Sequence, residues 1–130
     1  MTNITKTINS FLKENIPGLV IHNDLFPDTD TIGLVSVHDP APRIENRFID
    51  GSAVYQINIS YNARYENAAD ARSKLDSVLT LLDGRKLQDS IDGLELKITA
   101  NANVQFIGID DKNRSIYTCS ISVEYKTNNF

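Results

Sequence analysis

The sequence predicts a single α+β domain over residues 1–130, with a mainly antiparallel sheet of about four to six strands covered by two helices. Three observations lead to this prediction. A chain of 130 residues has the usual size of one domain. Residues 52–65 and 94–106 alternate apolar and polar side chains, which is typical of half-buried strands. Residues 3–14 and 68–83 instead repeat apolar side chains at helical spacing.

The N-terminal region is predicted to form one helix and two short strands. The helix over residues 3–14 stops before Pro17, because proline lacks the amide hydrogen that a helix needs. Residues 18–21 resemble a short strand, residues 22–28 a polar loop, and residues 31–38 a second strand. The expected apolar faces are Ile4, Ile8, Phe11 and Leu12 in the helix, and Ile32, Leu34 and Ser36 in the second strand.

Residues 39–51 are predicted to form a long connection, because two prolines and a closing Asp-Gly pair interrupt regular structure. Its middle, from Arg43 to Ile49, has the composition of an extended segment at a sheet edge. Two interpretations remain open. Arg43, Arg47, Phe48 and Ile49 suit a contact with another protein, since long loops are often functional. Alternatively, Phe48 and Ile49 pack into the core of a structural crossover.

The stretch 52–65 is the clearest strand in the chain, with strict alternation over its whole length. One face is expected to be buried and the other to meet solvent or a polar partner. The first consists of Ala53, Tyr55, Ile57, Ile59, Tyr61, Ala63 and Tyr65, and the second of Gln56, Asn58, Ser60, Asn62 and Arg64.

The second helix is predicted to begin after Asn67, a favoured N-cap residue, and to end at Gly84. Asp70 in its first turn favours the positive end of the helix dipole. The apolar stripe begins with small residues, so this end can approach the sheet closely. The stripe consists of Ala68, Ala71, Leu75, Val78, Leu79 and Leu82.

After a short polar link, two further strands are predicted, joined by a turn at residues 110–114. A bulge at Gly108 is expected where the alternation of the first strand slips. Residues 126–130 form a polar tail, and the predicted order is α-β-β-(β)-β-α-β-β. The expected buried faces are Leu94, Leu96, Ile98, Ala100, Ala102, Val104 and Phe106 in the first strand, and Tyr117, Cys119, Ile121, Val123 and Tyr125 in the second.

Composition argues against several classes of function. The net charge is −4 and lysine and arginine form no cluster, so specific nucleic-acid binding is not expected. The single cysteine excludes an internal disulfide framework. No apolar run approaches the roughly 18 residues of a membrane span, and the N-terminus lacks the apolar core of a signal peptide. We therefore expect a soluble protein made inside the cell, without a membrane partner.

The residues also give no pattern for catalysis or for metal binding. His22 and His38 lack partners at ligand spacing, so no metal and no cofactor is expected. Cys119 lies on the predicted buried face, where it acts as a small apolar residue. The acidic groups around Asp24 and at Asp110 lack the spacing of a calcium loop and suit turns instead. The chain is not expected to be an enzyme.

The whole chain resembles small siphophage proteins, in particular the tail-terminator and minor-capsid families. The resemblance rests on an N-terminal helix, the "LFP" segment, a long polar loop, "YQINISYNARYENAADAR" and "FIGIDDKNRSIYTCSISVEY". In these families a Gly-X-Asp turn with an arginine precedes a final alternating strand, and the chain departs from the pattern at Ile109, where a basic residue is common. The matching residues are Gly108, Asp110, Asp111 and Arg114, with Arg64, Ala71 and Arg72 in the earlier half.

The resemblance implies a structural role in the virion tail or neck, after assembly in the host cytoplasm. Such proteins form a ring, usually a hexamer, which caps the tail tube protein and joins it to the head connector. DNA passes through the ring without being bound specifically. Because a head-to-tail ring needs two complementary surfaces on each subunit, partner contacts are expected in the 39–51 loop and on the polar face of the 52–65 strand. The candidate contact residues are Arg43, Glu45, Arg47, Phe48, Gln56, Asn58 and Arg64.

Three alternatives to a tail terminator remain. The first is a neck or head-completion protein between the connector and the tail. The second, from another class, is a monomeric domain that presents Tyr55, Tyr61 and Tyr65 to a ligand. The third and least favoured is a small hydrolase with Cys119 as nucleophile, which would require a poised thiolate.

Overall fold

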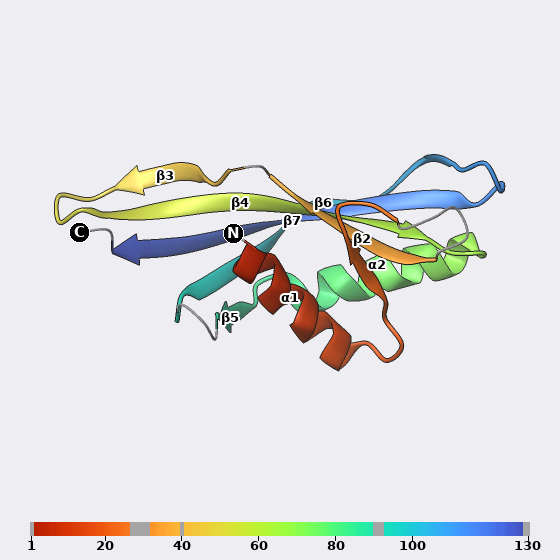
Figure 1. The fold of residues 1–130 in the computed structure, drawn as a ribbon, viewed down its shortest axis with the longest axis horizontal. Helices are drawn as coiled ribbons and strands as arrows, with labels where there is room; N and C mark the ends of the chain where they lie inside the picture. Colours follow the sequence, from red (N-terminus) through yellow and green to blue (C-terminus); the bar gives the residue numbers. More distant parts are fainter. Residues whose placement is uncertain (1, 27–31, 40, 90–92, 129–130) are drawn as a thin grey trace.

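The computed structural model describes residues 2–26, 32–39, 41–89 and 93–128. Over these residues it shows the expected α+β fold, in which two helices accompany one curled and mostly antiparallel sheet (Figure 1). The elements are α1 (Thr2–Asn15), β1 (Ile21–Asn23), β2 (Gly33–His38), β3 (Arg43–Arg47), β4 (Ser52–Arg64), α2 (Ala68–Leu82), β5 (Lys86–Gln88), β6 (Glu95–Ile109) and β7 (Ser115–Asn128).

The sheet is organised around the long strand β4. On one side β4 pairs with β7 along its whole length, from Ser52 opposite Asn128 to Arg64 opposite Ile116. On the other side its first half pairs with β3 and its second half with β2. The described strands follow the order β1-β2-β4-β7-β6-β5, and only β1 and β2 run parallel. The sheet has seven described strands rather than four to six, because β5 forms in the link that we expected to be irregular.

Both helices pack on the same face of this sheet (Figure 1). In α2, Ala71, Leu75, Val78 and Leu82 are fully buried, as predicted. The apolar side chains of α1 and α2 join one cluster with the predicted buried faces of β4 and β7. The N-cap is also confirmed, since the Asn67 Oδ1 accepts a hydrogen bond of 2.8 Å from the Ala69 backbone N–H.

The N-terminal strands differ from the prediction in position. The first begins at Ile21 instead of covering residues 18–21, and it includes part of the predicted loop. The second begins at Gly33, so Ile32 lies outside it and is exposed. A close backbone approach explains this boundary: a Cβ at Gly33, whose φ is +133°, would lie 2.8 Å from the Val20 carbonyl oxygen. Residues 27–31 of the predicted loop and strand lie outside the described residues.

The C-terminal hairpin differs from the prediction in length and in phase. Residues 126–128 belong to β7 rather than to a tail, because they pair with the start of β4. The pairing of β6 with β7 shifts register between Phe106 and Gly108, as predicted, and also at two earlier points that we did not predict. Beyond Ile98 the predicted face is only partly buried, because Val104 packs against the core whereas Ala100 and Phe106 are exposed. Phe106 is 54% exposed.

Candidate interaction surfaces

The edge strand β3 holds three of the predicted contact residues, and all five of its residues are exposed. Arg43 forms an ion pair of 2.7 Å with Glu45 and also donates a hydrogen bond to the side-chain oxygen of Gln56. These three predicted residues therefore already contact one another within the chain. Arg47 also projects from β3 and, among the described residues, forms no ion pair. The outer edge of β3 is not covered by any described strand.

The turn between β3 and β4 exposes two large apolar side chains. Ile49 is fully exposed, and Phe48 is 43% exposed with its ring centroid 5.0 Å from Lys126 Nζ. The interpretation in which Phe48 and Ile49 pack into the core is therefore wrong. The turn itself is well held, because Asp50 Oδ1 accepts hydrogen bonds of 2.6 Å and 2.9 Å from the hydroxyl and backbone N–H of Ser52. These bonds lower the pKa of Asp50.

The face of the sheet opposite the helices is neutral and polar along β4. Asn58, a predicted contact residue, accepts a hydrogen bond of 2.8 Å from the Ser122 hydroxyl on β7. Asn101 on β6 donates one of 3.2 Å to Ser120. Such bonds fix the side-chain amides in place while their remaining donors and acceptors stay available. This face therefore offers a preorganised surface for polar contacts.

Arg64, the last predicted contact residue, is buried rather than displayed, with 8% of its surface exposed. Its guanidinium carbon lies 3.9 Å from the centre of the Phe26 ring, and its Nε lies 3.8 Å from Asp110 Oδ2. Asp110 also accepts a hydrogen bond of 2.9 Å from Nε of Arg114, which is itself buried. Burial alone would raise the pKa of Asp110, but its hydrogen bonds and ion pair with Arg114 outweigh this and lower the pKa. This cluster ties the end of β4 to the turn between β6 and β7.

The last residues of β6, just before its turn into β7, also expose apolar side chains that were not predicted as contacts from the sequence. Phe106 and Ile107 are each 54% exposed, and Ile109 is 60% exposed. Phe106 packs edge-on against Tyr117, with ring centroids 5.7 Å apart, but no helix covers the pair completely. A signal was available: three large apolar residues within four positions break the alternation of a half-buried strand.

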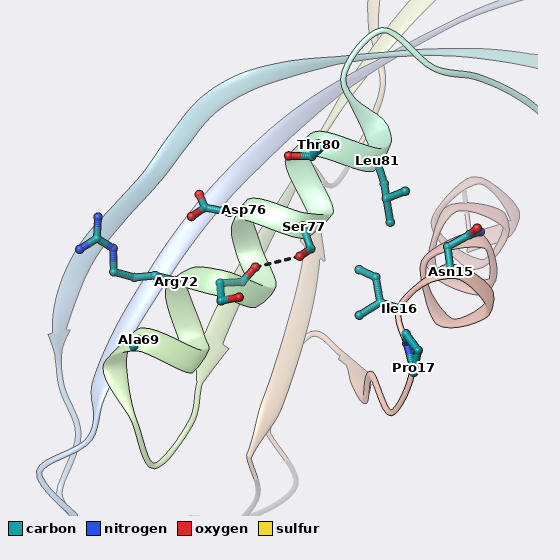
Figure 2. A pocket seen from close by; sticks show the side chains of 10 residues that line it. Asn15, Ile16, Pro17, Ala69, Arg72, Asp76, Ser77, Thr80 and Leu81 are labelled. Carbon is teal, nitrogen blue, oxygen red and sulfur yellow. Dashed lines mark hydrogen bonds between the residues drawn. The ribbon is translucent and has the colours of Figure 1, made fainter.

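Two hollows lie beside the helices. One, of about 740 Å³, separates the end of α1 from α2 (Figure 2). There Ile16 and Leu81 point toward each other, while the Ser77 hydroxyl donates to the Ser73 carbonyl at 3.0 Å. The other, of about 700 Å³, lies between α1 and the β1–β2 edge and is lined by Lys6, Lys13 and His38 among other residues. The second hollow is also lined by Ser36, whose hydroxyl accepts a hydrogen bond of 3.1 Å from Asn9, and by His38, whose Nδ1 lies 2.7 Å from the Asp39 carbonyl oxygen.

Two residues that the alternative functions require, Cys119 and Tyr61, are buried. Burial raises the pKa of Cys119 to about 12, so its thiol is protonated at neutral pH. This fits the predicted role of Cys119 as an apolar core residue. Tyr61 is also fully buried, with its hydroxyl donating to Asn9 at 2.8 Å, and Tyr55 stacks on Tyr125. A ligand-binding face made of Tyr55, Tyr61 and Tyr65 is therefore not available as a whole.

The described residues contain neither a candidate metal site nor a candidate membrane-spanning helix. Within the part of the chain that the structure describes, no three His, Cys, Asp or Glu residues gather in a group that could hold a metal ion. No described helix is both long enough and apolar enough to cross a membrane. Comparison of the chain with protein-family models gave no match, and comparison with curated proteins gave none.

Proposed function

We propose that this chain is a structural virion protein, a siphophage tail terminator that caps the tail tube as a ring and joins it to the head connector. The proposal starts from the sequence resemblance to the tail-terminator and minor-capsid families. The observation that carries it in the structure is the position of both helices on one face of the sheet. The opposite face carries polar side chains of β4, β7 and β6, and some of them are hydrogen-bonded to one another.

A broad polar surface on a rigid sheet suits assembly between proteins. Neutral side chains such as Asn58 and Ser60 lose less hydration free energy on contact than charged ones would. Because the Asn58 side chain is already held by Ser122, less conformational entropy is lost when it meets a partner. We assign this face to the contacts that the subunit makes within the assembled tail.

The protonated state of Cys119 further favours a structural role over a thiol hydrolase. A hydrolase of that class needs a thiolate, and a pKa of about 12 leaves almost none at neutral pH. The proposed protein acts through its surfaces, without catalysis or a cofactor.

The test is native mass spectrometry over a concentration series, with negative-stain imaging of the same samples. A terminator should give closed rings, six-fold in particular, and should bind the ends of purified tail tubes. A neck protein would form rings that bind the connector but leave tube ends uncapped. A chain that stays monomeric at every concentration and does not cap tube ends would contradict the proposal.

A matched pair of variants tests the polar face. Ser60→Arg places a large charged side chain in the middle of the sheet face opposite the helices, whereas Ser73→Arg places the same side chain at an exposed position of α2. We expect Ser60→Arg to reduce tube capping strongly and Ser73→Arg to leave it unchanged. Circular dichroism would check that both variants keep the native fold. Equal capping by both variants would show that the sheet face opposite the helices does not contact the tail tube.

A further inference from the structure

Large apolar side chains are exposed at two opposite ends of the sheet. In Figure 1 the hairpin of β3 and β4 forms one end of the molecule, and the hairpin of β6 and β7 forms the other. Each hairpin exposes three large apolar residues. Because the two hairpins lie at opposite ends of the molecule, these two groups cannot cover each other within one chain. The exposed residues are Ile44, Phe48 and Ile49 at the first end, and Phe106, Ile107 and Ile109 at the second.

Exposed charges of both signs lie beside the apolar residues at each end. Arg47 precedes Phe48 at the first end, and Asp111 follows close after Ile109 at the second. Both are exposed, and within the described residues neither forms an ion pair in its own chain. Arg47 at the first end and Asp111 at the second are thus available to pair with each other, and Asp50 and Lys112 beside them add a second pair of opposite charges.

We infer that the β3–β4 hairpin of one copy docks on the β6–β7 hairpin of a second copy. Phe48 and Ile49 cover Phe106 and Ile109, and Arg47 pairs with Asp111. The inference rests on the proposed function and deepens it, by naming the contact between neighbouring subunits. Because the two surfaces differ, the contact is head-to-tail, and repeated copies close into a ring when the rotation between them is right.

Both hairpins are held in shape before they meet. The β6–β7 turn is fixed by Asp110, whose Oδ1 accepts hydrogen bonds from the backbone N–H groups of Lys112 and Arg114 at 3.1 Å and 2.8 Å. The β3–β4 turn is fixed by the bonds between Asp50 and Ser52. Ordered turns lose little conformational entropy on binding, so a modest apolar area suffices to hold two copies together.

Cross-linking between engineered cysteines tests this contact directly. Cys119 is buried, so a short bismaleimide reacts with added surface thiols in preference to it. We would mix Ile49→Cys protein with Ile109→Cys protein and expect a cross-linked dimer in the mixture only. Neither variant should cross-link to itself. As a control, Lys13→Cys on the exposed surface of α1 should not cross-link to Ile109→Cys.

Charge reversal tests the polar part of the contact. Arg47→Asp or Asp111→Arg alone should reduce the cross-linked fraction roughly tenfold, since attraction becomes repulsion. Mixing the two reversals on opposite partners should restore it. Arg85→Asp, a reversal on an exposed residue beyond the end of α2, should leave the cross-linked fraction unchanged and should not rescue Asp111→Arg.

The outcomes separate this contact from the ring function. Self-cross-linking of either single variant, or equal reaction with the Lys13→Cys control, would overturn the head-to-tail contact. Closed rings without a cross-link between positions 49 and 109 would also overturn it, while leaving the terminator proposal intact. Cross-linked open chains that never close would support the contact and count against a ring-forming terminator.

Discussion

The middle of the sheet and its two hairpin ends have similar apolar side chains but differ in burial. Ile59 on β4 and Ile121 on β7 are fully buried, whereas Ile109 on β6 and Ile49 in the β3–β4 turn are exposed. The helices account for this difference, because they pack in one cluster with Ile59 and Ile121, whereas Ile49 and Ile109 lie outside that cluster. An apolar residue in a strand thus contributes to stability only where a second layer meets it.

The ends are nevertheless ordered, by polar contacts instead of by burial of apolar surface. At the β6–β7 end two buried arginines, Arg64 and Arg114, converge on Asp110. At the β3–β4 end the Arg43–Glu45 pair is exposed to solvent, which weakens its contribution. The core of the molecule is therefore stabilised by packing. The β6–β7 end is stabilised by buried charges, and the β3–β4 end is held mainly by its turn.

The largest expected effect compares the same substitution in the two environments. Ile121→Ala removes apolar surface from the closed core and should lower the free energy of unfolding by about 3 kcal/mol. Ile109→Ala, in the strand that pairs with β7, should lower it by less than about 0.5 kcal/mol because the side chain is already exposed. Urea denaturation of both variants measures the difference. Equal losses would mean that the β6–β7 end is covered in solution.

The same contrast shows which parts of the fold the sequence could predict. Alternation correctly identified the shared faces of β4 and β7, because both strands keep their phase over their length. In β6 it correctly identified Leu96 and Ile98 as buried, but Ala100 and Phe106 are exposed where register shifts interrupt the pairing with β7. The strand β5 was also missed, since only three residues pair with β6 and leave little periodicity to detect. Local pattern thus predicts strands well and their irregularities poorly.

The second expected effect compares two arginines. Arg114→Met should lower the free energy of unfolding by roughly 2 kcal/mol, because a buried guanidinium loses charge-assisted hydrogen bonds. Arg43→Met should cost no more than about 0.5 kcal/mol, because its partner Glu45 is also solvated. Hydrogen exchange of the amides of Lys112 and Arg114, which donate to Asp110, would show whether the turn loosens. An unchanged exchange rate in Arg114→Met would contradict this role for Arg114.

The arginines also show how far the sequence could define the interaction surfaces. Arg43, Glu45, Arg47 and Phe48 were predicted as contacts, and the structure places all four on the exposed β3 hairpin. Arg64 was predicted with them, but its aspartate partner comes much later in the sequence, so only the tertiary structure shows that it is buried. The exposed apolar group on β6 was missed for the opposite reason. Of this group only Phe106 was placed on the predicted buried face, and the fold leaves it 54% exposed.

The smallest expected effect concerns pH and compares a buried thiol with an exposed one. Burial raises the pKa of Cys119 to about 12, above the value of about 8.5 expected in the unfolded chain. The stability that this shift contributes is fully present below pH 8.5 and is lost as the pH rises toward 12, since the unfolded thiol releases its proton first. Between pH 8 and pH 9 the native chain should lose about 0.7 kcal/mol more than Cys119→Ala, measured by urea denaturation. In the Cys119→Ala background, an added Ile109→Cys thiol on the uncovered end should titrate near 8.5 and give no such loss. If the free energy of unfolding changed with pH in the same way for the native chain and Cys119→Ala, solvent would reach the Cys119 thiol. The contrast between a buried middle of the sheet and its exposed ends would then be wrong.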